Sequence, residues 1–249
     1  MILVFLFLTG LVFGSFANVI ILRLNTGESL IFKGSRCFFC SQKLQWFELI
    51  PIVSFLVLRG RCRSCRSRIS WQYPVVELAS GFLFLLIYVS TATSTDIWSL
   101  GLTTAFFWLL LVISVYDIRH KIIPNSLVYL AVIIAFLPLI IGQQLAPNLI
   151  SGIALFSFFA FLWWVSNGRW MGFGDAKLAL AIGIFLGWPL SFVGVLLSFW
   201  VGALFGLVLI FLRRLHLKTH VPFGPFLSMG ALTAFLWGER ITAWYLSLL

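Results

Sequence analysis

Residues 1–22 of the chain read MILVFLFLTGLVFGSFANVIIL, and none of them carries a charge. At a rise of 1.5 Å per residue, a helix of this length crosses a bilayer core of about 30 Å. A cleaved signal peptide would place basic residues before such a stretch and a small-residue cleavage site after it. Here the basic residues begin after it, at Arg23. The stretch is therefore predicted to be a retained first membrane helix with its N-terminus outside.

The composition of the whole chain indicates the same class of protein. Of its 249 residues, 61% are hydrophobic, and only 17 are Lys or Arg and 7 are Asp or Glu. Soluble domains are roughly half apolar and about a quarter charged. A soluble enzyme, a disordered chain and a disulfide-stapled mini-protein are therefore excluded. A net charge of +10 would point to nucleic acid in a soluble protein, but in a membrane protein it first reports topology, and no nucleic-acid partner is expected.

Seven further apolar segments follow the first, so that the fold class is predicted to be an all-α polytopic membrane protein of about eight transmembrane helices. These segments are Tyr73–Val89, Ile97–Tyr116, Ile122–Ile141, Leu149–Val165, Ala176–Trp188, Leu190–Leu212 and Phe223–Leu236. Leu49–Leu58 is also apolar but too short to span, so we expect it to pack inside the first loop or to lie at the interface. The predicted domains are the first helix (1–22), a large cytoplasmic loop (23–72) and a seven-helix membrane domain (73–249).

The distribution of basic residues sets the predicted orientation. Residues 23–68 hold nine of the 17 Lys and Arg residues. Placing this loop in the cytoplasm puts 16 of the 17 on the same side and leaves only Arg240 outside. Loop charge that is this one-sided determines orientation. Both termini are therefore predicted to lie outside.

All four cysteines lie in this large loop, as the pairs Cys37/Cys40 and Cys62/Cys65. Two C-x-x-C pairs at such a distance can place four thiolates tetrahedrally around zinc. Disulfides are the competing interpretation, but the cytoplasm keeps thiols reduced. A redox motif would need only one pair in a βαβ context. Because the cysteines leave no open coordination position, the zinc is predicted to be structural.

Basic side chains crowd the second cysteine pair, at Arg61, Arg63, Arg66 and Arg68. They can offset the net charge of −2 of zinc with four thiolates, and they can also contact anionic lipid head groups. His216 and His220 have the i, i+4 spacing of a helical metal pair. They stand among basic residues with no acid nearby, so we expect a solvated cytoplasmic turn there.

Three of the seven acids lie in or at the edge of a predicted span: Glu77, Asp117 and Asp175. Such acids are costly in a membrane and indicate function by default. Asp117 ends one predicted span and Asp175 begins another, both at the cytoplasmic face. Two carboxylates brought together there could share one proton, one acting as general base for a water and the other as general acid. Gly172 and Gly174 would let a peptide backbone approach closely.

Other roles for these acids remain open at this point. Asp117 beside Arg119 and Asp175 beside Lys177 could be ordinary interfacial charges, and an Asp at a helix N-terminus is a common cap. Membrane carboxylates also serve coupled proton transport. The chain could accordingly be a zinc-knuckled transporter or assembly scaffold that uses its carboxylates as a proton relay.

Six motifs in order resemble the type IV prepilin peptidase family, G-x-G-D intramembrane aspartic proteases that combine leader peptidase and N-methyltransferase activities. They are GSFANVIILRL (14–24), the two cysteine pairs, YPVVEL (73–78), DIRHKIIP (117–124), GFGD (172–175) and VPFGPFL (221–227). Phe38, Asn25 and Asn125 depart from residues that are frequent in the family, but none of the departures touches the two aspartates. The match runs over nearly the whole chain.

The resemblance implies a membrane enzyme with Asp117 and Asp175 as its catalytic pair. Its substrates would be prepilins or pseudopilins, cut at the cytoplasmic face of the bacterial inner membrane before a hydrophobic helix that stays in the bilayer. The family also implies methylation of the new N-terminal residue with S-adenosylmethionine. No soluble methyltransferase motif is present, and Glu77 is the candidate for methyl transfer or substrate contact. A peptidase without methyltransferase activity is the alternative, and the sequence leaves the pilus or secretion system and the oligomeric state open.

Overall fold

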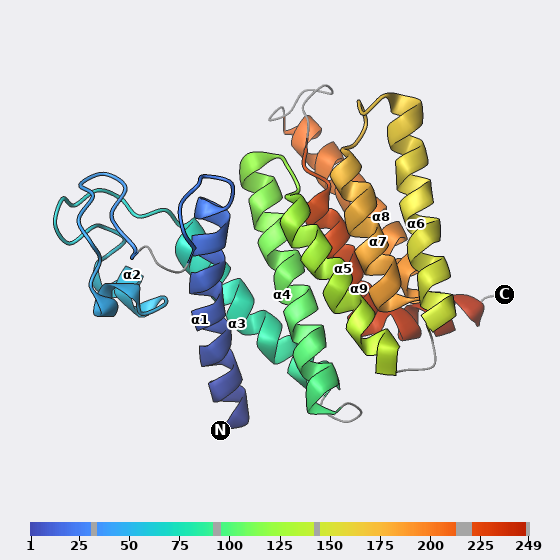
Figure 1. Cartoon of the computed structure of the whole chain (residues 1–249), viewed down its shortest axis with the longest axis horizontal. Coiled ribbons are helices and arrows are strands. Elements are labelled where there is room, and N and C mark those ends of the chain that lie inside the picture. Colours follow the sequence, from blue (N-terminus) through green and yellow to red (C-terminus); the bar gives the residue numbers. More distant parts are fainter. Residues whose placement is uncertain (31–33, 92–95, 142–144, 213–220, 248–249) are drawn as a thin grey trace. The chain divides into compact units, whose positions relative to one another are not determined.

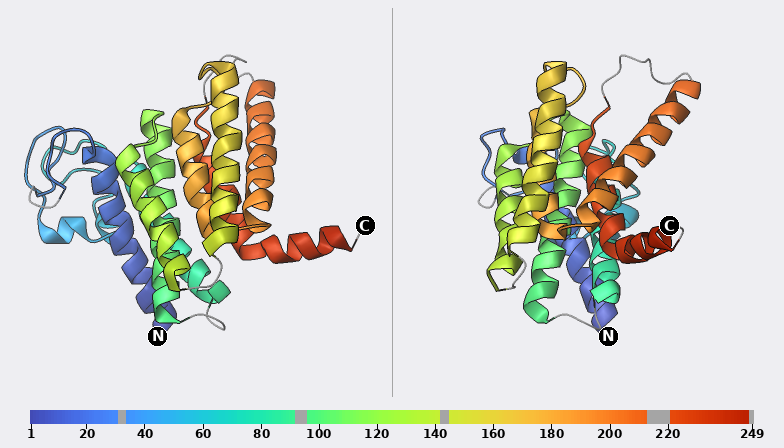
Figure 2. Two further views of the ribbon diagram at one scale, coloured as in Figure 1. Left: turned by 45° about the vertical axis from the view of Figure 1, so that its right-hand side comes forward. Right: turned by 90° about the vertical axis from the view of Figure 1, so that its right-hand side faces the viewer.

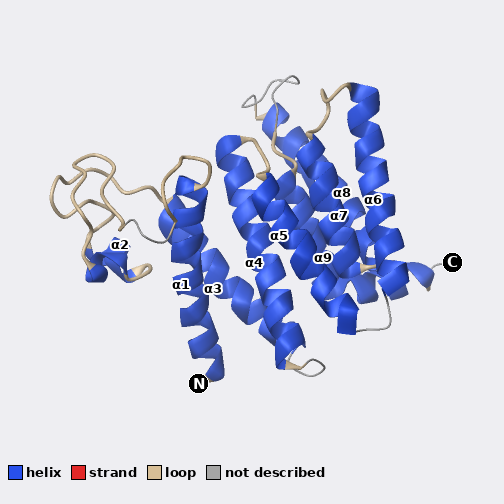
Figure 3. Ribbon diagram, in the orientation of Figure 1, coloured by secondary structure: helices blue, strands red, loops and turns tan. Residues whose placement is uncertain are grey.

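The computed structural model describes residues 1–30, 34–91, 96–141, 145–212 and 221–247. In these ranges all regular secondary structure is helical, with two isolated β-bridges in the first loop (Figure 3). The all-α class predicted from the sequence is confirmed for these residues. The chain forms two compact units, Met1–Ser94 and Thr95–Leu249, whose helices are coloured blue to teal and green to red in Figure 1.

The first unit is built on two long helices, α1 (Ile2–Arg23) and α3 (Gln72–Thr91), which pack along each other. Their close approach requires Gly14, because a Cβ at this position would lie 2.6 Å from the Cα of Glu77. A Cβ at Gly10 would similarly lie 2.7 Å from the Cα of Gly81. Gly10 and Gly14, spaced as G-x-x-x-G, therefore serve the close packing of these two helices.

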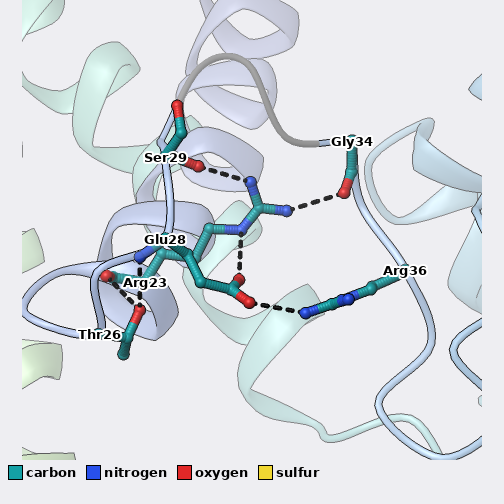
Figure 4. Close-up of polar contacts among 6 residues, drawn as sticks. All are labelled: Arg23, Thr26, Glu28, Ser29, Gly34 and Arg36. Atoms are coloured by element: carbon teal, nitrogen blue, oxygen red, sulfur yellow. Dashed lines mark hydrogen bonds and ion pairs between the residues drawn. The ribbon is translucent and has the colours of Figure 1, made fainter.

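Hydrogen bonds and ion pairs connect the end of α1 to the first residues of the loop (Figure 4). The guanidinium of Arg23 donates to the carbonyl oxygens of Ser29 and Gly34, at 3.1 and 3.2 Å. Glu28 accepts a hydrogen bond from Arg36 at 2.7 Å, and its other oxygen lies 3.9 Å from Arg23. The carboxylate of Glu28 is thus committed to two arginines, and the start of the loop is tied to the end of α1.

The later part of the loop contains two short helices, the 3₁₀ helix η1 (Trp46–Leu49) and the α-helix α2 (Val53–Val57). The carboxylate of Glu48 accepts the amide of Gln45 at 2.7 Å and so caps η1. The apolar segment Leu49–Leu58 was expected to be too short to span, and it forms only the end of η1 and the single helix α2.

The second unit contains six helices in the described ranges: α4 (Ile97–His120), α5 (Asn125–Ile141), α6 (Leu145–Ser166), α7 (Phe173–Leu186), α8 (Leu190–Phe211) and α9 (Gly224–Leu246). α7 contacts α5, α6, α8 and α9, and α4 packs on α5 and α9. Figure 2 shows the last turns of α9 extending away from the rest of this unit.

The central position of α7 follows from its small and apolar residues. Most of them are buried, and Gly183 lets the helix approach α6 until a Cβ would lie 2.6 Å from the Cα of Gly152. Phe185 stacks on Phe106 of α4, with ring centroids 4.0 Å apart. At 14 residues, α7 measures about 21 Å, less than a hydrocarbon core. The first turn of α7 therefore need not lie at the same depth in the membrane as the ends of the longer helices beside it.

The long helices of the described ranges occupy the places of the eight predicted spans. Five of them, α1, α3, α4, α6 and α8, are long and apolar enough to cross a membrane. That α5, α7 and α9 also cross stays a prediction. The predicted domain boundaries at residues 23 and 73 also stay a prediction. The two compact units are divided elsewhere, and the first unit contains the first helix, the loop and α3. His216 and His220 lie outside the described residues, as do Arg213, Arg214 and Lys218.

Candidate active site

Asp117 lies in the last turn of α4 and is 5% exposed. The helix ends at His120, and the next residue, Lys121, adopts a left-handed conformation and donates its amide to the Asp117 carbonyl. The side-chain Oδ2 of Asp117 accepts the amide of Gly224, the first residue of α9, at 3.1 Å. The carboxylate is therefore oriented by a residue 107 positions away in the sequence.

Asp175 is the third residue of α7 and is 6% exposed. Its Oδ2 accepts the amide of Gly172, the residue that caps the helix, at 3.1 Å. Asp175 thus bonds to the backbone of the N-cap residue from the third position of the helix. Its second oxygen, Oδ1, is buried and has no hydrogen-bond partner among the described residues. Capping therefore uses one oxygen of Asp175 and leaves the other one available.

The side chain of Ile123, in the turn between α4 and α5, lies beside two glycines that neighbour or bind the aspartates. A Cβ at Gly174, next to Asp175, would lie 2.9 Å from the Cβ of Ile123. A Cβ at Gly224, which holds Asp117, would lie 3.4 Å from the Cδ1 of the same side chain. The two carboxylates are also close enough to interact electrostatically. Acids 58 positions apart in sequence are thus brought to one end of this unit, where α4 ends and α7 begins (Figure 1).

Lys177, the basic residue nearest to Asp175 in the sequence, contacts other residues. The ammonium of Lys177 donates to Oδ1 of Asn125 at 2.9 Å and lies over the rings of Tyr129 and Phe173. It therefore links α7 to α5 and does not pair with Asp175. A buried carboxylate oxygen without a partner is unusual for a structural acid, because an unmade hydrogen bond is costly in the interior. The arrangement is suited to binding a water molecule or a substrate group between two carboxylates.

Glu77 lies in the other unit, in the second turn of α3, and is 6% exposed. Its Oε2 accepts the amide of Ile52 at 2.7 Å, and its side chain also bonds to the hydroxyl of Ser15. Close by, Asn18 of α1 links to α3, since its amide donates to the carbonyl of Tyr73 at 3.2 Å. The carboxylate therefore joins α1, α3 and the loop that precedes α2.

The four cysteines are brought together by two turns with the same backbone conformation. In each pair, the amide of the first cysteine donates to the carbonyl five residues later, at 3.0 and 2.8 Å. The residue after each pair is left-handed, with φ of 57° at Ser41 and 58° at Arg66. The four Sγ atoms lie within 4.8 Å of one another and are free thiols.

This donor set fits zinc. The Sγ atoms of Cys37 and Cys65 are 3.8 Å apart, and a tetrahedral zinc with 2.3 Å bonds has sulfur–sulfur edges of about 3.8 Å. Burial raises the pKa of Cys37, but hydrogen bonds from the amides of Cys40 and Phe39 and from the side chains of Ser67 and Cys40 together bring the pKa down to about 6. The amide of Gln42 lowers the pKa of Cys40, but desolvation and the neighbouring sulfurs raise it to about 11. Crowding of negative charge among the sulfurs is what a bound dication would relieve.

Sequence reasoning missed two residues of this site, Gly224 and Ile123. Gly224 lies within the motif VPFGPFL and Ile123 within DIRHKIIP, so both motifs had been singled out. Neither residue carries a titratable group, and nothing in the residue types indicates that the Gly224 amide would orient Asp117 or that Ile123 would pack beside Gly174 and Gly224.

The chain matches two family models, one in each compact unit. Residues 8–91 match the Bacterial Peptidase A24 N-terminal domain, and residues 104–207 match the Type IV leader peptidase family. No solved structure matches the chain significantly.

Several curated relatives that align along most of their length share one name. Proteins called prepilin leader peptidase/N-methyltransferase from Stutzerimonas stutzeri, Bacillus subtilis and Pseudomonas aeruginosa are 34%, 33% and 32% identical to the chain. The alignments cover 95%, 98% and 96% of this chain and 91%, 97% and 91% of the respective relatives. The resemblance inferred from the ordered motifs is thereby confirmed, and the chain belongs to the type IV leader peptidase family.

Proposed function

We propose that the chain is a membrane aspartic endopeptidase that cleaves the basic leader of type IV prepilins or pseudopilins. The observation that carries this proposal is the pairing of Asp117 and Asp175. Both are buried, both are oriented by a backbone amide on one oxygen, and Asp175 keeps a second, unpartnered oxygen. The names of the relatives supply the substrate class.

The proposed reaction needs one ionised and one protonated carboxyl group, the state that two closely placed carboxylates favour. The ionised aspartate takes a proton from a water molecule while the oxygen of that water attacks the scissile carbonyl carbon. The partner aspartate donates its proton to the leaving nitrogen as the C–N bond breaks. The amides of Gly172 and Gly224 keep the two carboxylates in place throughout.

The proposed location is the cytoplasmic face of the bacterial inner membrane. This orientation rests on the distribution of basic residues, 16 of 17 of which then lie on one side. A prepilin could keep its hydrophobic helix in the bilayer while the bond after its leader reaches the helix ends that carry Asp117 and Asp175.

Methylation of the new N-terminus with S-adenosylmethionine is a further part of the proposal, and it rests on the names of the relatives. The acceptor amine must lose its proton before it attacks, so a nearby base is required. Glu77, a buried acid in the first unit, is the candidate for this role or for substrate contact. Purified protein that cleaves prepilin but never consumes S-adenosylmethionine would show this part to be wrong.

The cysteine cluster is proposed to hold a structural zinc ion. Its four sulfurs would complete the coordination sphere, so the metal would fold the loop and would not activate water. The residues that hold it would be Cys37, Cys40, Cys62 and Cys65.

The decisive experiment is cleavage of a prepilin peptide by the purified protein in detergent. Asp117→Asn and Asp175→Asn should each lower kcat by about 10³-fold or more, because each removes a proton-transfer group. Asp96→Asn is the matched control: Asp96 caps α4 through the amide of Ser99, and Asn caps equally well. Normal cleavage by either of the first two variants would refute the aspartate pair.

A further inference from the structure

We infer that η1, α2 and Trp71 form a lipid-docking surface, seated in the interfacial layer of the membrane that α1 and α3 enter. This inference concerns the first unit alone and does not depend on what the chain cleaves. It requires only that α1 and α3, both long and apolar enough, cross the membrane.

A hydrogen bond first fixes how deep α2 lies. The amide of Ile52, the residue before α2, donates to Oε2 of Glu77 at 2.7 Å. Glu77 is five residues beyond Gln72, the start of α3. At 1.5 Å per residue, this hydrogen bond lies about 7.5 Å inside the end of the helix. The loop therefore turns back along α3 before α2 begins.

An aromatic contact independently places α2 at the same level. The ring of Phe55, the buried residue of α2, lies 5.0 Å from the ring of Trp71, which immediately precedes α3. Gly60 closes the segment with φ of +65°, and its amide bonds to the Phe55 carbonyl at 2.9 Å. In Figures 1 and 2, α2 accordingly lies level with the C-terminal half of α1 and not beyond its end.

The remaining face of α2 is apolar and exposed. Leu56 is 66% exposed, Val57 74% and Val53 52%. Trp46 and Leu49 of η1 and Trp71 extend the same kind of surface, and all are exposed. Tryptophan at the end of a membrane helix is typical of the interfacial layer. Apolar side chains at this depth would meet lipid and not bulk water.

Charge identifies the occupant as lipid. Residues 46–71 contain five arginines and a single acid, Glu48, whose carboxylate already caps η1. The guanidinium of Arg63 lies over the ring of Phe47, 5.3 Å from its centroid, so positive charge borders the apolar surface. An apolar face rimmed by arginine is complementary to anionic head groups. It would repel a basic leader peptide, which argues against the proposed substrate as its occupant.

Photo-crosslinking in vesicles tests the inference. A diazirine amino acid is placed singly at position 56, 57 or 39 of the full-length protein, in vesicles of phosphatidylglycerol and phosphatidylcholine with tagged chains. Phe39 is the matched control, because it is 78% exposed in the same loop but lies in a cysteine turn. Positions 56 and 57 should label lipid roughly ten-fold more than position 39, since crosslinking requires contact.

Two results would overturn the inference. Lipid labelling at 56 and 57 no higher than at 39 would place α2 outside the interface. Crosslinks from 56 and 57 to protein would show a protein-covered face. The same labelling should be seen in an Asp117→Asn background, so that failure of the proposed peptidase and failure of lipid docking can be told apart.

Discussion

Asp117 and Asp175 each hold one oxygen on the amide of a glycine, and each of those glycines lies at the start of a helix. A glycine is needed at position 224 because a Cβ there would lie 2.7 Å from Oδ2 of Asp117. Any side chain would displace the carboxylate that the amide orients. The geometry of the pair thus depends on a residue with no chemistry of its own.

Gly224→Ala should therefore lower peptidase activity by about 10–100-fold, because a shift of an ångström in a catalytic group has an effect of that order. The change is measured as kcat on a prepilin peptide. Gly206→Ala is the matched control, since no atom of the described residues lies within 4 Å of a Cβ at that position of α8. Equal activity of the two variants would mean that the Gly224 amide does not position Asp117.

At the residue scale, the sequence was sufficient to predict the titratable residues of the site but not the other residues around them. Asp117 and Asp175 were predictable because only seven acids exist and these two end or begin apolar segments at the same face. The hydrogen bond from Gly224 to Asp117 and the position of Ile123 beside Gly174 and Gly224 are tertiary, and they leave no periodicity or charge in the sequence. A capping role for Asp175 was one of the roles left open by the sequence, but the burial that isolates its second oxygen arises only from packing.

At the scale of elements, the two cysteine turns are predicted to depend on their metal. Purified protein should contain about one zinc ion per chain, and Cys40→Ser should lose it, because one fewer thiolate leaves an incomplete tetrahedral site. Elemental analysis measures the metal, and limited proteolysis of residues 34–71 reports the fold of the loop. Ser64→Ala, in the second turn, should keep the zinc. Retention of full zinc by Cys40→Ser would contradict four-cysteine ligation.

The contact of α1 with α3 carries a second prediction about elements. Gly14→Ala would force a Cβ to within 2.6 Å of the backbone of Glu77, and backbone cannot move aside as a flexible side chain can. We expect a loss of about 1–3 kcal/mol, typical of overpacking, seen as a lower Tm in detergent. Gly101→Ala in α4 is the control, because within the part of the chain that the structure describes no atom lies within 4 Å of a Cβ built at this position. An unchanged Tm for Gly14→Ala would show that the helices separate without cost.

Helix positions were predictable because apolar length is what a membrane selects. Some ends were predicted too, such as the start of α4 at Ile97 and of α8 at Leu190, but others were not. α9 runs to Leu246, beyond the predicted Leu236, because Glu239 and Arg240 interrupt the apolar run without breaking the helix. α7 begins at Phe173, ahead of the predicted Ala176, because the Gly172 cap and Asp175 start it. Capping and surface charge thus shift the ends of helices whose centres hydropathy locates.

At the scale of the whole molecule, orientation follows from charge and is the remaining prediction. With both termini outside, the segments 91–96 and 142–148, which contain no Lys or Arg, are predicted to lie outside, and the basic segment 23–68 is predicted to face the cytoplasm. Alkaline phosphatase fused after residue 148 should be active, because that enzyme folds only outside, whereas a fusion after residue 60 should be inactive. Each chimera is normalised to its own expression. The reverse pattern would put the aspartate pair on the outer face, away from the cytoplasmic leader of a prepilin, and both the topology and the proposed substrate access would then have to be abandoned.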